Sequence, residues 1–263
     1  MITIYYHLIG ETSEHFQNEL KFMTKAFKLV IFKTLEDFDA IPNKLYGKSV
    51  LRCTVNFIHT CLNTDYTLLS ADTRQYLQTK LHYKHNLNLY NCMQYLDNSL
   101  MLNTGKFVKL KDIENKYLAE NTKLFIKPSS VLKYFDATFI ESEYPIGNYL
   151  TYNFNIDMSE ELCIISDIKI IDAETRFFVI NGKVLTGSYY RIDNIYCEKA
   201  IQPDEEIFSI AQKYVDLYKP CKAFVIDIVL TDNQYKIIEY NPINCAGIYA
   251  CDYNLIMQKL ADT

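Results

Sequence analysis

The sequence contains few glycines and prolines and no tryptophan. Seven glycines and six prolines in 263 residues leave little room for long flexible linkers. We find no internal repeat and no low-complexity tract, and the content of 49% hydrophobic and 22% charged residues is typical of globular proteins. The length therefore predicts one large domain or two small ones.

Long hydrophobic runs are also missing. Runs such as Phe224–Leu230 end after a few residues, far short of the roughly 18 to 20 that cross a bilayer. Residues 1–10 show none of the basic region, apolar core and small-residue cleavage site of a signal peptide. We therefore expect a cytoplasmic protein that does not associate with membranes.

Metal-binding and redox spacings are absent, although the chain has eight cysteines and five histidines. No two cysteines form Cys-x-x-Cys, and the histidines lack the spacing of metal ligands, so we assign no zinc site. Several cysteines lie inside apolar runs, which predicts buried free thiols in a reducing compartment.

The charge balance is acidic, with a net charge of −5 and a pI of about 5.6. Binding to nucleic-acid backbones requires clustered lysine and arginine, so no general affinity for nucleic acid is expected. Two interpretations of the acidity stay open. One is an ordinary solvated surface, and the other is a site for a divalent cation.

Hydrophobic periodicity and turn residues predict a change of organisation near residues 105–122. Residues 1–120 are predicted as a small mixed α/β unit, and residues 121–263 as strand pairs interrupted by one helix. The strongest turn signal is Asn181-Gly182, which predicts a hairpin. Strands are predicted at 1–8, 29–32, 51–58, 123–127, 162–171, 176–180, 183–190, 224–230 and 235–241, and helices at 16–27, 203–219 and 255–260.

The last predicted hairpin carries two carboxylates. If Thr231 faces Tyr235 across the turn, Asp227 lies opposite Glu239 with β-carbons about 4.5 to 5.5 Å apart, and Asn241 shares their face. Like charges at this range destabilise a sheet unless a cation or a shared proton lies between them. Two carboxylates and an amide oxygen suit Mg²⁺, whereas a one-residue register slip would separate them on a solvated face.

If the two carboxylates are uncompensated, replacing Glu239 with Gln relieves repulsion. The stability of the metal-free protein is then expected to stay equal or to rise slightly.

A second group of charged residues lies upstream. Lys127 ends an apolar strand and Lys133 follows in a serine-containing loop, where each is able to reach phosphate as a point charge. Glu174 and Arg176 share a face at a spacing of two, and Arg191 closes the following strand. Alone, these residues are more typical of a solvated strand end and a salt-bridged sheet face than of a site.

In their joint order, these segments resemble the ATP-grasp superfamily. The closest resemblance is to the clade named for two arginines and one lysine, often found in phage and prophage settings, and Arg176, Arg191 and Lys127 match that signature. Residues 1–120 match only loosely, as a pre-ATP-grasp domain would. The resembling segments are Phe125–Pro128 with Lys133, Ile165–Ile168, Glu174–Val179 with Asn181–Lys183, Ser188–Arg191, Phe224–Asp227 and Glu239–Tyr249.

The resemblance implies an ATP-grasp fold of mixed α+β and α/β type. In it, two α+β lobes hold a nucleotide between them, and a small α/β pre-ATP-grasp domain precedes them. Residues 1–120 would form the preceding domain and residues 121–263 the ATP-grasp domain. ATP and Mg²⁺, or Mn²⁺, would be the cofactors.

The same resemblance implies a role for each matching residue. Lys127 and Lys133 would contact the phosphates, and the segment Ser166, Asp167, Ile168 and Lys169 would contact the adenine. Glu174 would hold the ribose or orient Arg176, while Arg176 and Arg191 would act on the γ-phosphate and the transition state. Asp227, Glu239 and Asn241 would bind one or two metal ions.

One stretch departs from the family pattern. Many ATP-grasp enzymes carry a glycine-rich loop over the phosphates, because glycine lets backbone amides approach closely. Residues 129–138 contain no glycine, and Asp136 stands where a small residue is expected. Compensation by Lys133 and weak closure over the nucleotide both stay open.

The resemblance implies an ATP-dependent carboxylate–amine ligase that forms an acyl phosphate and ADP. The candidate residues include charges but no Ser/His/Asp or Cys/His arrangement, which fits a reaction without a protein nucleophile. A phosphotransferase with a hydroxyl acceptor and a nucleotide-binding module without turnover are the alternatives. By analogy with the clade, the unknown carboxylate and amine substrates include a peptide or protein.

Overall fold

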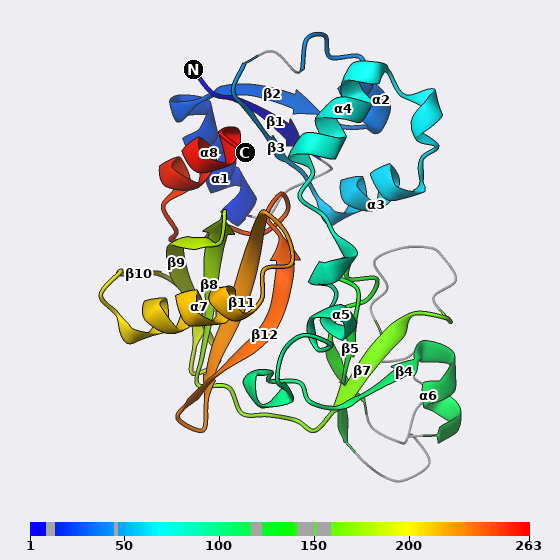
Figure 1. The fold of residues 1–263 in the computed structure, drawn as a ribbon, viewed down its shortest axis with the longest axis vertical. Helices are drawn as coiled ribbons and strands as arrows, with labels where there is room; N and C mark the ends of the chain where they lie inside the picture. The colour runs from blue at the N-terminus through cyan, green and yellow to red at the C-terminus, as the bar shows by residue number, and fades with distance from the viewer. Residues whose placement is uncertain (9–13, 45–46, 117–122, 141–149, 151–158) are drawn as a thin grey trace.

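Three β-sheets and the helices around them form the part of the chain described by a computed structural model (Figure 1). The described residues are 1–8, 14–44, 47–116, 123–140, 150 and 159–263, with backbone alone described at 14–18 and 114–116.

The first sheet lies in the N-terminal part of the chain and is parallel, with strand order β2-β1-β3. Its strands are β1 (Thr3–His7), β2 (Lys28–Phe32) and β3 (Ser49–Arg52). The helices of this part are α1 (Glu14–Ala26), α2 (Leu35–Asp39), α3 (Val55–Asn63), α4 (Ala71–Lys80) and α5 (Leu89–Cys92), with short 3₁₀ turns η1 (Tyr66–Leu68), η2 (His85–Leu87) and η3 (Asn98–Leu100).

The strand predicted at 51–58 is wrong beyond Arg52. The Thr54 side chain accepts a hydrogen bond from the Phe57 amide, which is the N-cap arrangement, and α3 begins at Val55. A capping threonine thus ends the strand inside a run of residues that favours β structure.

The second sheet is antiparallel, with strand order β4-β7-β5-β6. It comprises β4 (Lys106–Lys109), β5 (Leu124–Pro128), β6 (Thr138–Ile140) and β7 (Leu162–Ser166), with α6 (Leu110–Lys116) after β4. The strand predicted at 162–171 ends at Ser166, because residues 167–170 are exposed and connect this sheet to the next one. Gly105 precedes β4 and lies against β7, where an added Cβ would stand 1.6 Å from the Ile165 carbonyl oxygen.

The third sheet is antiparallel and has five strands in the order β10-β9-β8-β11-β12. Its strands are β8 (Ala173–Ile180), β9 (Lys183–Ile192), β10 (Ile195–Ile201), β11 (Ala223–Thr231) and β12 (Gln234–Pro242). Asn181 and Gly182 join β8 to β9 with φ angles of 53° and 73°, which confirms the predicted hairpin turn. Helix α7 (Glu206–Leu217) follows β10, and α8 (Tyr253–Ala261) ends the chain.

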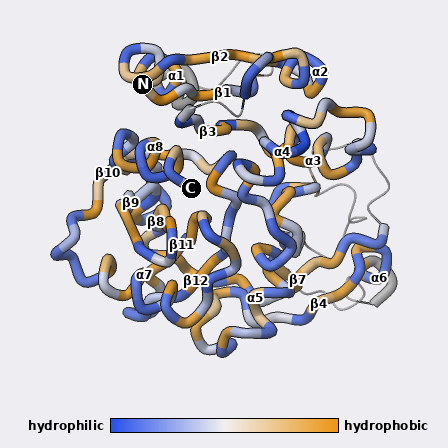
Figure 2. The backbone as a smooth tube through the Cα atoms, turned by 45° about the horizontal axis from the view of Figure 1, so that its top comes forward, coloured by the Kyte–Doolittle hydropathy of each residue, from blue (hydrophilic) through white to orange (hydrophobic). Residues whose placement is uncertain are grey.

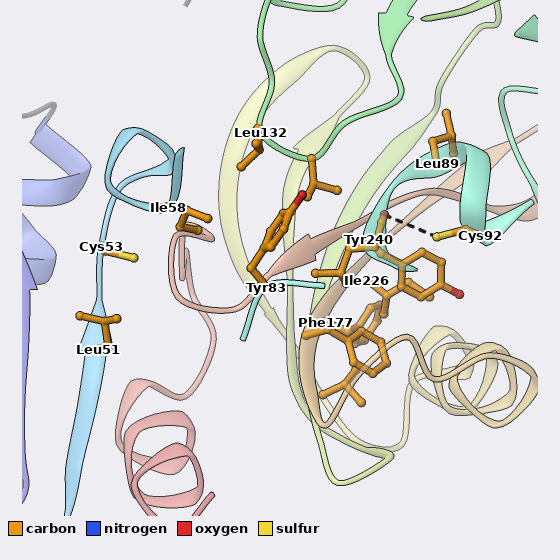
Figure 3. Packing of buried hydrophobic residues seen from close by; sticks show 14 of the residues in the cluster. Leu51, Cys53, Ile58, Tyr83, Leu89, Cys92, Leu132, Phe177, Ile226 and Tyr240 are labelled. Atoms are coloured by element: carbon orange, nitrogen blue, oxygen red, sulfur yellow. Dashed lines mark hydrogen bonds between the residues drawn. The ribbon is translucent and has the colours of Figure 1, made fainter. Parts of the chain in front are cut away.

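The N-terminal part and the five-stranded sheet share one hydrophobic core. Leu51 and Ile58 belong to the same buried cluster as Phe177, Ile226 and Tyr240 (Figure 3). Hydrophobic stretches such as β2 and β7 stand out along the backbone (Figure 2). This packing joins the region that matches the ATP-grasp pattern to the region that precedes it.

The four-stranded sheet contains strands from both predicted parts of the chain. β4 lies before residue 120 and pairs with β7, which lies after it. The predicted division into residues 1–120 and 121–263 stays a prediction, and this pairing favours the early end of the predicted 105–122 boundary. No helix among the described residues is long and apolar enough to span a membrane.

Candidate active site

A cleft of about 780 Å³ lies between the four-stranded and the five-stranded sheets. β5 and β6 contribute one wall, and β8, β9, β11 and β12 contribute the other. Nine of the residues predicted from the sequence line it: Lys127, Lys133, Ile168, Lys169, Glu174, Arg176, Arg191, Asp227 and Glu239. The cleft thus brings together charged residues from two different sheets.

The pairing of β11 with β12 places Asp227 opposite Glu239, as the sequence predicts. The assumed turn is wrong, because Thr231 faces Gln234 across a two-residue turn. A one-residue shift at Ile238 then restores the predicted pairing. The two differences from the assumed register cancel, so both carboxylates face the cleft.

Asp227 is paired with Arg176, which lies directly opposite it on β8. Arg176 Nε donates to Asp227 Oδ1 at 2.8 Å and Nη2 donates to Oδ2 at 2.7 Å, a bidentate geometry. The side chains are 9% and 1% exposed. The neighbouring Asp227 charge helps to hold the pKa of Arg176 well above its usual value against the opposing effect of burial. Arg176 also donates to the Gly247 carbonyl at 3.3 Å.

Glu239 is paired with two lysines from the other wall. Lys127 donates to Glu239 Oε2, and Lys133 Nζ lies 3.4 Å from Oε1. Asn241 Nδ2 donates to Glu239 at 2.8 Å and to Asp227 at 3.1 Å, so the amide bridges the two carboxylates. Burial opposes ionisation of Glu239, but the two ammonium groups outweigh it and hold the Glu239 pKa well below its usual range.

The expectation of two uncompensated carboxylates is therefore wrong. Each carboxylate has a cationic partner, and those partners come from sequence positions that hairpin geometry alone does not relate to it. The described residues include no group of three His, Cys, Asp or Glu side chains placed to hold a metal. The carboxylate oxygens of Asp227 and Glu239 still fit a hard cation, because such an oxygen accepts more than one contact. Asn241 would offer its amide oxygen only after a flip of the side chain, since its nitrogen faces the carboxylates.

Glu174 and Arg191 form a further ion pair in the cleft. They face each other across β8 and β9, and Arg191 Nη1 donates to Glu174 Oε1. The Tyr190 hydroxyl donates to Glu174 Oε2 at 2.9 Å. Because the Arg191 side chain is 48% exposed, its guanidinium remains accessible from the cleft.

Tyr190 and Tyr249 line the cleft beside Arg176. The rings of Tyr190 and Tyr249 are stacked with centroids 5.1 Å apart. The Arg176 guanidinium carbon lies 5.5 Å and 5.2 Å from those centroids, within cation–π range. Tyr249 has φ of 52°, which a non-glycine residue rarely adopts. No periodic signal marks these positions, because Tyr249 lies outside regular secondary structure.

The first half of the glycine-free loop, residues 129–133, uses its backbone amides internally. The amides of residues 129–133 donate in turn to Leu162 O, Glu161 Oε1, Asn88 Oδ1, Ser130 Oγ and Ser130 O, at 2.8 to 3.2 Å. The positive φ of 51° at Lys133 follows this tight turn. These five amides are therefore not available to hold phosphate, so any phosphate contact from this segment must come from side chains.

The segment predicted to meet adenine is only partly in the cleft. Ile168 and Lys169 line it, whereas Ser166 and Asp167 do not. Ser166 is buried with its hydroxyl 3.5 Å from Asn103 Oδ1, and Asp167 is exposed. Asn241 likewise does not line the cleft and contacts it only through the two carboxylates. The apolar residues of the cleft that sequence reasoning missed include Leu87, Leu89, Leu102, Phe125, Phe135 and Phe139.

The loop after β12, which carries Gly247 and Tyr249, is fixed from the N-terminal sheet. Buried Arg52 donates to the carbonyls of Ile243, Asn244 and Ala246 at 2.9 to 3.2 Å and is paired with Glu19. The Asn244 side chain in turn donates to the Leu51 and Lys80 carbonyls. The N-terminal part of the chain thus determines where the Arg176 contacts lie.

Replacing Lys127 with Ala is expected to weaken ATP binding at least tenfold even without metal. The change removes a cation that faces the cleft, and the loop amides cannot replace it. Calorimetric titration measures the effect. Lys123→Ala is the control, because Lys123 is exposed and does not line the cleft. Equal affinity of the two variants would remove Lys127 from the site.

Sequence comparison assigns the chain to a known family. The profile of an ATP-grasp domain, family 2 of the clade named for two arginines and one lysine, matches residues 104–258. Because the match covers more than half of the chain, the protein belongs to this family of ATP-grasp domains. The predicted membership in the clade is confirmed, and so is the predicted fold class. No curated protein matches the sequence.

Solved structures with the same fold include three ligases. D-alanine–D-alanine ligase from Bacillus anthracis complexed with ATP aligns over 99% of this chain and 90% of its own, with a TM-score of 0.53 and 15% identity. The ATP-grasp ligase PsnB complexed with a minimal precursor aligns over 99% of this chain and 97% of its own, with a TM-score of 0.50 and 15% identity. N5-carboxyaminoimidazole synthetase from Staphylococcus aureus aligns over 99% of this chain and 76% of its own, with a TM-score of 0.51 and 13% identity. At these identities the similarity shows the ATP-grasp fold.

Proposed function

We propose that the protein is an ATP-dependent ligase that joins a carboxylate to an amine through an acyl phosphate and releases ADP. The observation that carries the proposal is the convergence of Lys127, Lys133, Arg176 and Arg191 with two carboxylates in one cleft. Family membership supports ATP as the nucleotide. The names of similar structures, an ATP-grasp ligase complexed with a precursor and a D-alanine–D-alanine ligase among them, support a carboxylate and an amine as co-substrates.

The proposed reaction transfers a phosphoryl group and then displaces it. A carboxylate oxygen bonds to the γ-phosphorus of ATP as the bond to the β,γ-bridging oxygen breaks, and ADP leaves. The amine nitrogen then bonds to the acyl carbon, the acyl C–O bond breaks, and phosphate and a proton are released. Neither step needs a protein nucleophile. Positioning and charge supply the catalysis.

In this proposal the four cations divide the negative charge of the reacting groups. Lys127 and Lys133 bind the phosphates with their side chains, since the loop amides are already used. Arg176 and Arg191 neutralise charge at the γ-phosphate, with Arg176 held in place by Asp227 and two tyrosine rings. Apolar residues of the cleft, Phe125 and Ile168 among them, receive the adenine.

Mg²⁺, when bound, would supply positive charge that offsets the negative charge of the phosphates. Its proposed ligands are Asp227, Glu239 and Asn241, and Glu239 is held by Lys127. Nucleotide binding then requires an exchange of partners, in which Lys127 leaves Glu239 for a phosphate oxygen and frees the carboxylate. The exchange keeps charges of opposite sign adjacent throughout, which lowers its cost.

Trapping with hydroxylamine tests the proposed chemistry. Peptides carrying Asp or Glu side chains are incubated with the protein, Mg-ATP and hydroxylamine. Formation of a hydroxamate with an equal amount of ADP is expected, because hydroxylamine attacks an acyl phosphate in place of the amine. Formation of AMP and pyrophosphate contradicts the proposal, and a phosphorylated peptide hydroxyl indicates a phosphotransferase instead.

A nucleotide-binding module without turnover is the second candidate. The observation that favours it is the loop at residues 129–133, whose amides are all donated within the protein. If this candidate is correct, calorimetry is expected to show Mg-ATP binding, and neither ADP nor hydroxamate is expected to form with any peptide in the panel.

A further inference from the structure

A second cavity, of about 430 Å³, lies next to the nucleotide cleft and shares Ser129 and Ser130 with it. Its other walls come from the end of α3, from η2 and α5, and from the start of β7. Its volume is within the range of small-ligand sites. None of the residues predicted for the nucleotide or the metal lines it. The polar side chains around it include Asn63, Asn88, Asn91, Tyr83, Tyr134 and Glu161.

Glu161 is the acidic group of this cavity. Its Oε1 accepts a hydrogen bond from the Ser130 amide at 3.2 Å, and no Lys, Arg or His of the described residues forms an ion pair with it. Burial raises its pKa to about 7. The adjacent Glu160 is exposed, is paired with Lys109 and Lys111, and has its pKa lowered to about 2. A partly buried carboxylate without a cation is costly, and its position in a cavity indicates a ligand.

Two tyrosines lie close to the Glu161 carboxyl. Burial raises the pKa of Tyr83 to about 12, and the nearby charges of Tyr134 and Glu161 contribute. Burial and the Glu161 charge also raise the pKa of Tyr134. Phenol rings and a carboxylate around one cavity are the groups that recognise organic cations. An anionic ligand would meet repulsion here, and a neutral ligand would leave the carboxylate without a counter-ion.

We propose that this second cavity binds an ammonium or guanidinium group on an alkyl chain, with Glu161 as its counter-ion and the Tyr83 and Tyr134 rings beside it. The site is distinct from the nucleotide cleft, and binding there does not depend on the proposed ligase activity. The Ser130 amide connects the two sites, because it donates to Glu161 from a segment that also lines the nucleotide cleft.

Ligand titration monitored by nuclear magnetic resonance tests this proposal with simple probes. n-Butylammonium and n-butylguanidinium are compared with n-butanol, which has the same chain and no charge. At pH 8 at least one of the two cations is expected to bind at least tenfold more tightly than n-butanol, and the stronger one identifies the class of ligand. Equal binding of all three probes would show that charge plays no part and would overturn the proposal.

Glu161→Gln supplies the decisive comparison, with Glu160→Gln as its matched control. The first variant is expected to lose at least tenfold in cation affinity and nothing for n-butanol, whereas the second is expected to bind as the parent does. Because burial disfavours the charged carboxylate, Glu161→Gln is not expected to lower the melting temperature at pH 8. Glu161→Asp keeps the charge and is expected to bind cations better than Glu161→Gln, and failure of both variants alike would contradict the assignment.

The pH dependence gives an independent measurement. Affinity for the cation is expected to rise between pH 6 and pH 8, as Glu161 loses its proton. His85 lines the cavity, and His59, whose pKa is lowered by burial, packs against Tyr134. Tyr83 and Tyr134, whose pKa values are raised, stay protonated in this range. The contribution of Glu161 is therefore the part of the rise that disappears in Glu161→Gln, and an unchanged profile in that variant would overturn the proposal.

Discussion

Replacing Glu239 with Gln is expected to abolish the rise in melting temperature that Mg-ATP gives the parent protein. The change removes a charged ligand from the proposed metal site and leaves Asp227 as the only carboxylate of the pair. The same variant is expected to lose stability without nucleotide, because the Lys127 side chain, only 12% exposed, loses its charged partner. We expect a cost of about 1–3 kcal/mol, measured by paired thermal melts with and without Mg-ATP.

The structure reverses what the sequence predicts for this variant without metal. If the two carboxylates were unpaired, Glu239→Gln would be expected to keep or raise the stability of the protein. Because Glu239 is paired with Lys127, the variant is expected to be less stable than the parent. Because the pKa of Glu239 is depressed, its stabilising contribution is complete above the usual glutamate pKa of about 4.3 and is lost as the pH falls through the lower folded value. The stability gap between parent and variant should therefore persist from pH 8 to about pH 5 and close in stronger acid.

Glu36→Gln is the control for this experiment, because Glu36 is exposed on α2 and does not line the cleft. It removes the same charge and is expected to change neither melt. If Mg-ATP stabilises Glu239→Gln as much as it stabilises the control, Glu239 is not a metal ligand.

Replacing Arg176 with Met is expected to destabilise the protein by about 3–5 kcal/mol, because the change leaves the buried charge of Asp227 without a partner. The double variant Arg176→Met with Asp227→Leu is expected to recover most of this loss, since an apolar pair of similar volume avoids the desolvation of both charges. Neither variant is expected to turn over ATP. Denaturant unfolding and ADP release measure the two effects.

Arg191→Met is the matched control for Arg176→Met. Both arginines belong to the signature of the clade, but the Arg191 side chain is 48% exposed and its pair with Glu174 is partly solvated. Its removal is expected to cost at most about 1 kcal/mol of stability and still to abolish turnover. Equal destabilisation by the two changes would contradict the buried-pair argument.

Local sequence patterns were sufficient for the elements on which the site stands. Asn181 and Gly182 adopt positive φ angles cheaply, so their hairpin could be predicted with its turn. Side chains alternate between the two faces along each strand, so Asp227 and Glu239 could be placed on the same face of one sheet. The order of charged segments from Lys127 to Asn241 was enough to predict the family, and the family match confirms it.

In the hairpin of β11 and β12, the agreement between the predicted and the observed pairing arose partly by chance. The sequence does not show the shift at Ile238, because a register irregularity depends on how the strand packs on its neighbours rather than on residue type. The prediction came out right because the shorter turn and the shift cancel.

Tertiary structure alone decided which charges meet. Lys127 and Glu239 are 112 positions apart and belong to different sheets, so no periodicity relates them. The five amides of residues 129–133 find acceptors in three separate segments of the chain, which leaves this half of the glycine-free loop without available amide donors. Sequence patterns report the few neighbours that a residue has along its own helix or strand. The partner of a buried charge depends on which elements pack together, and this packing is determined by the burial of apolar surface throughout the core.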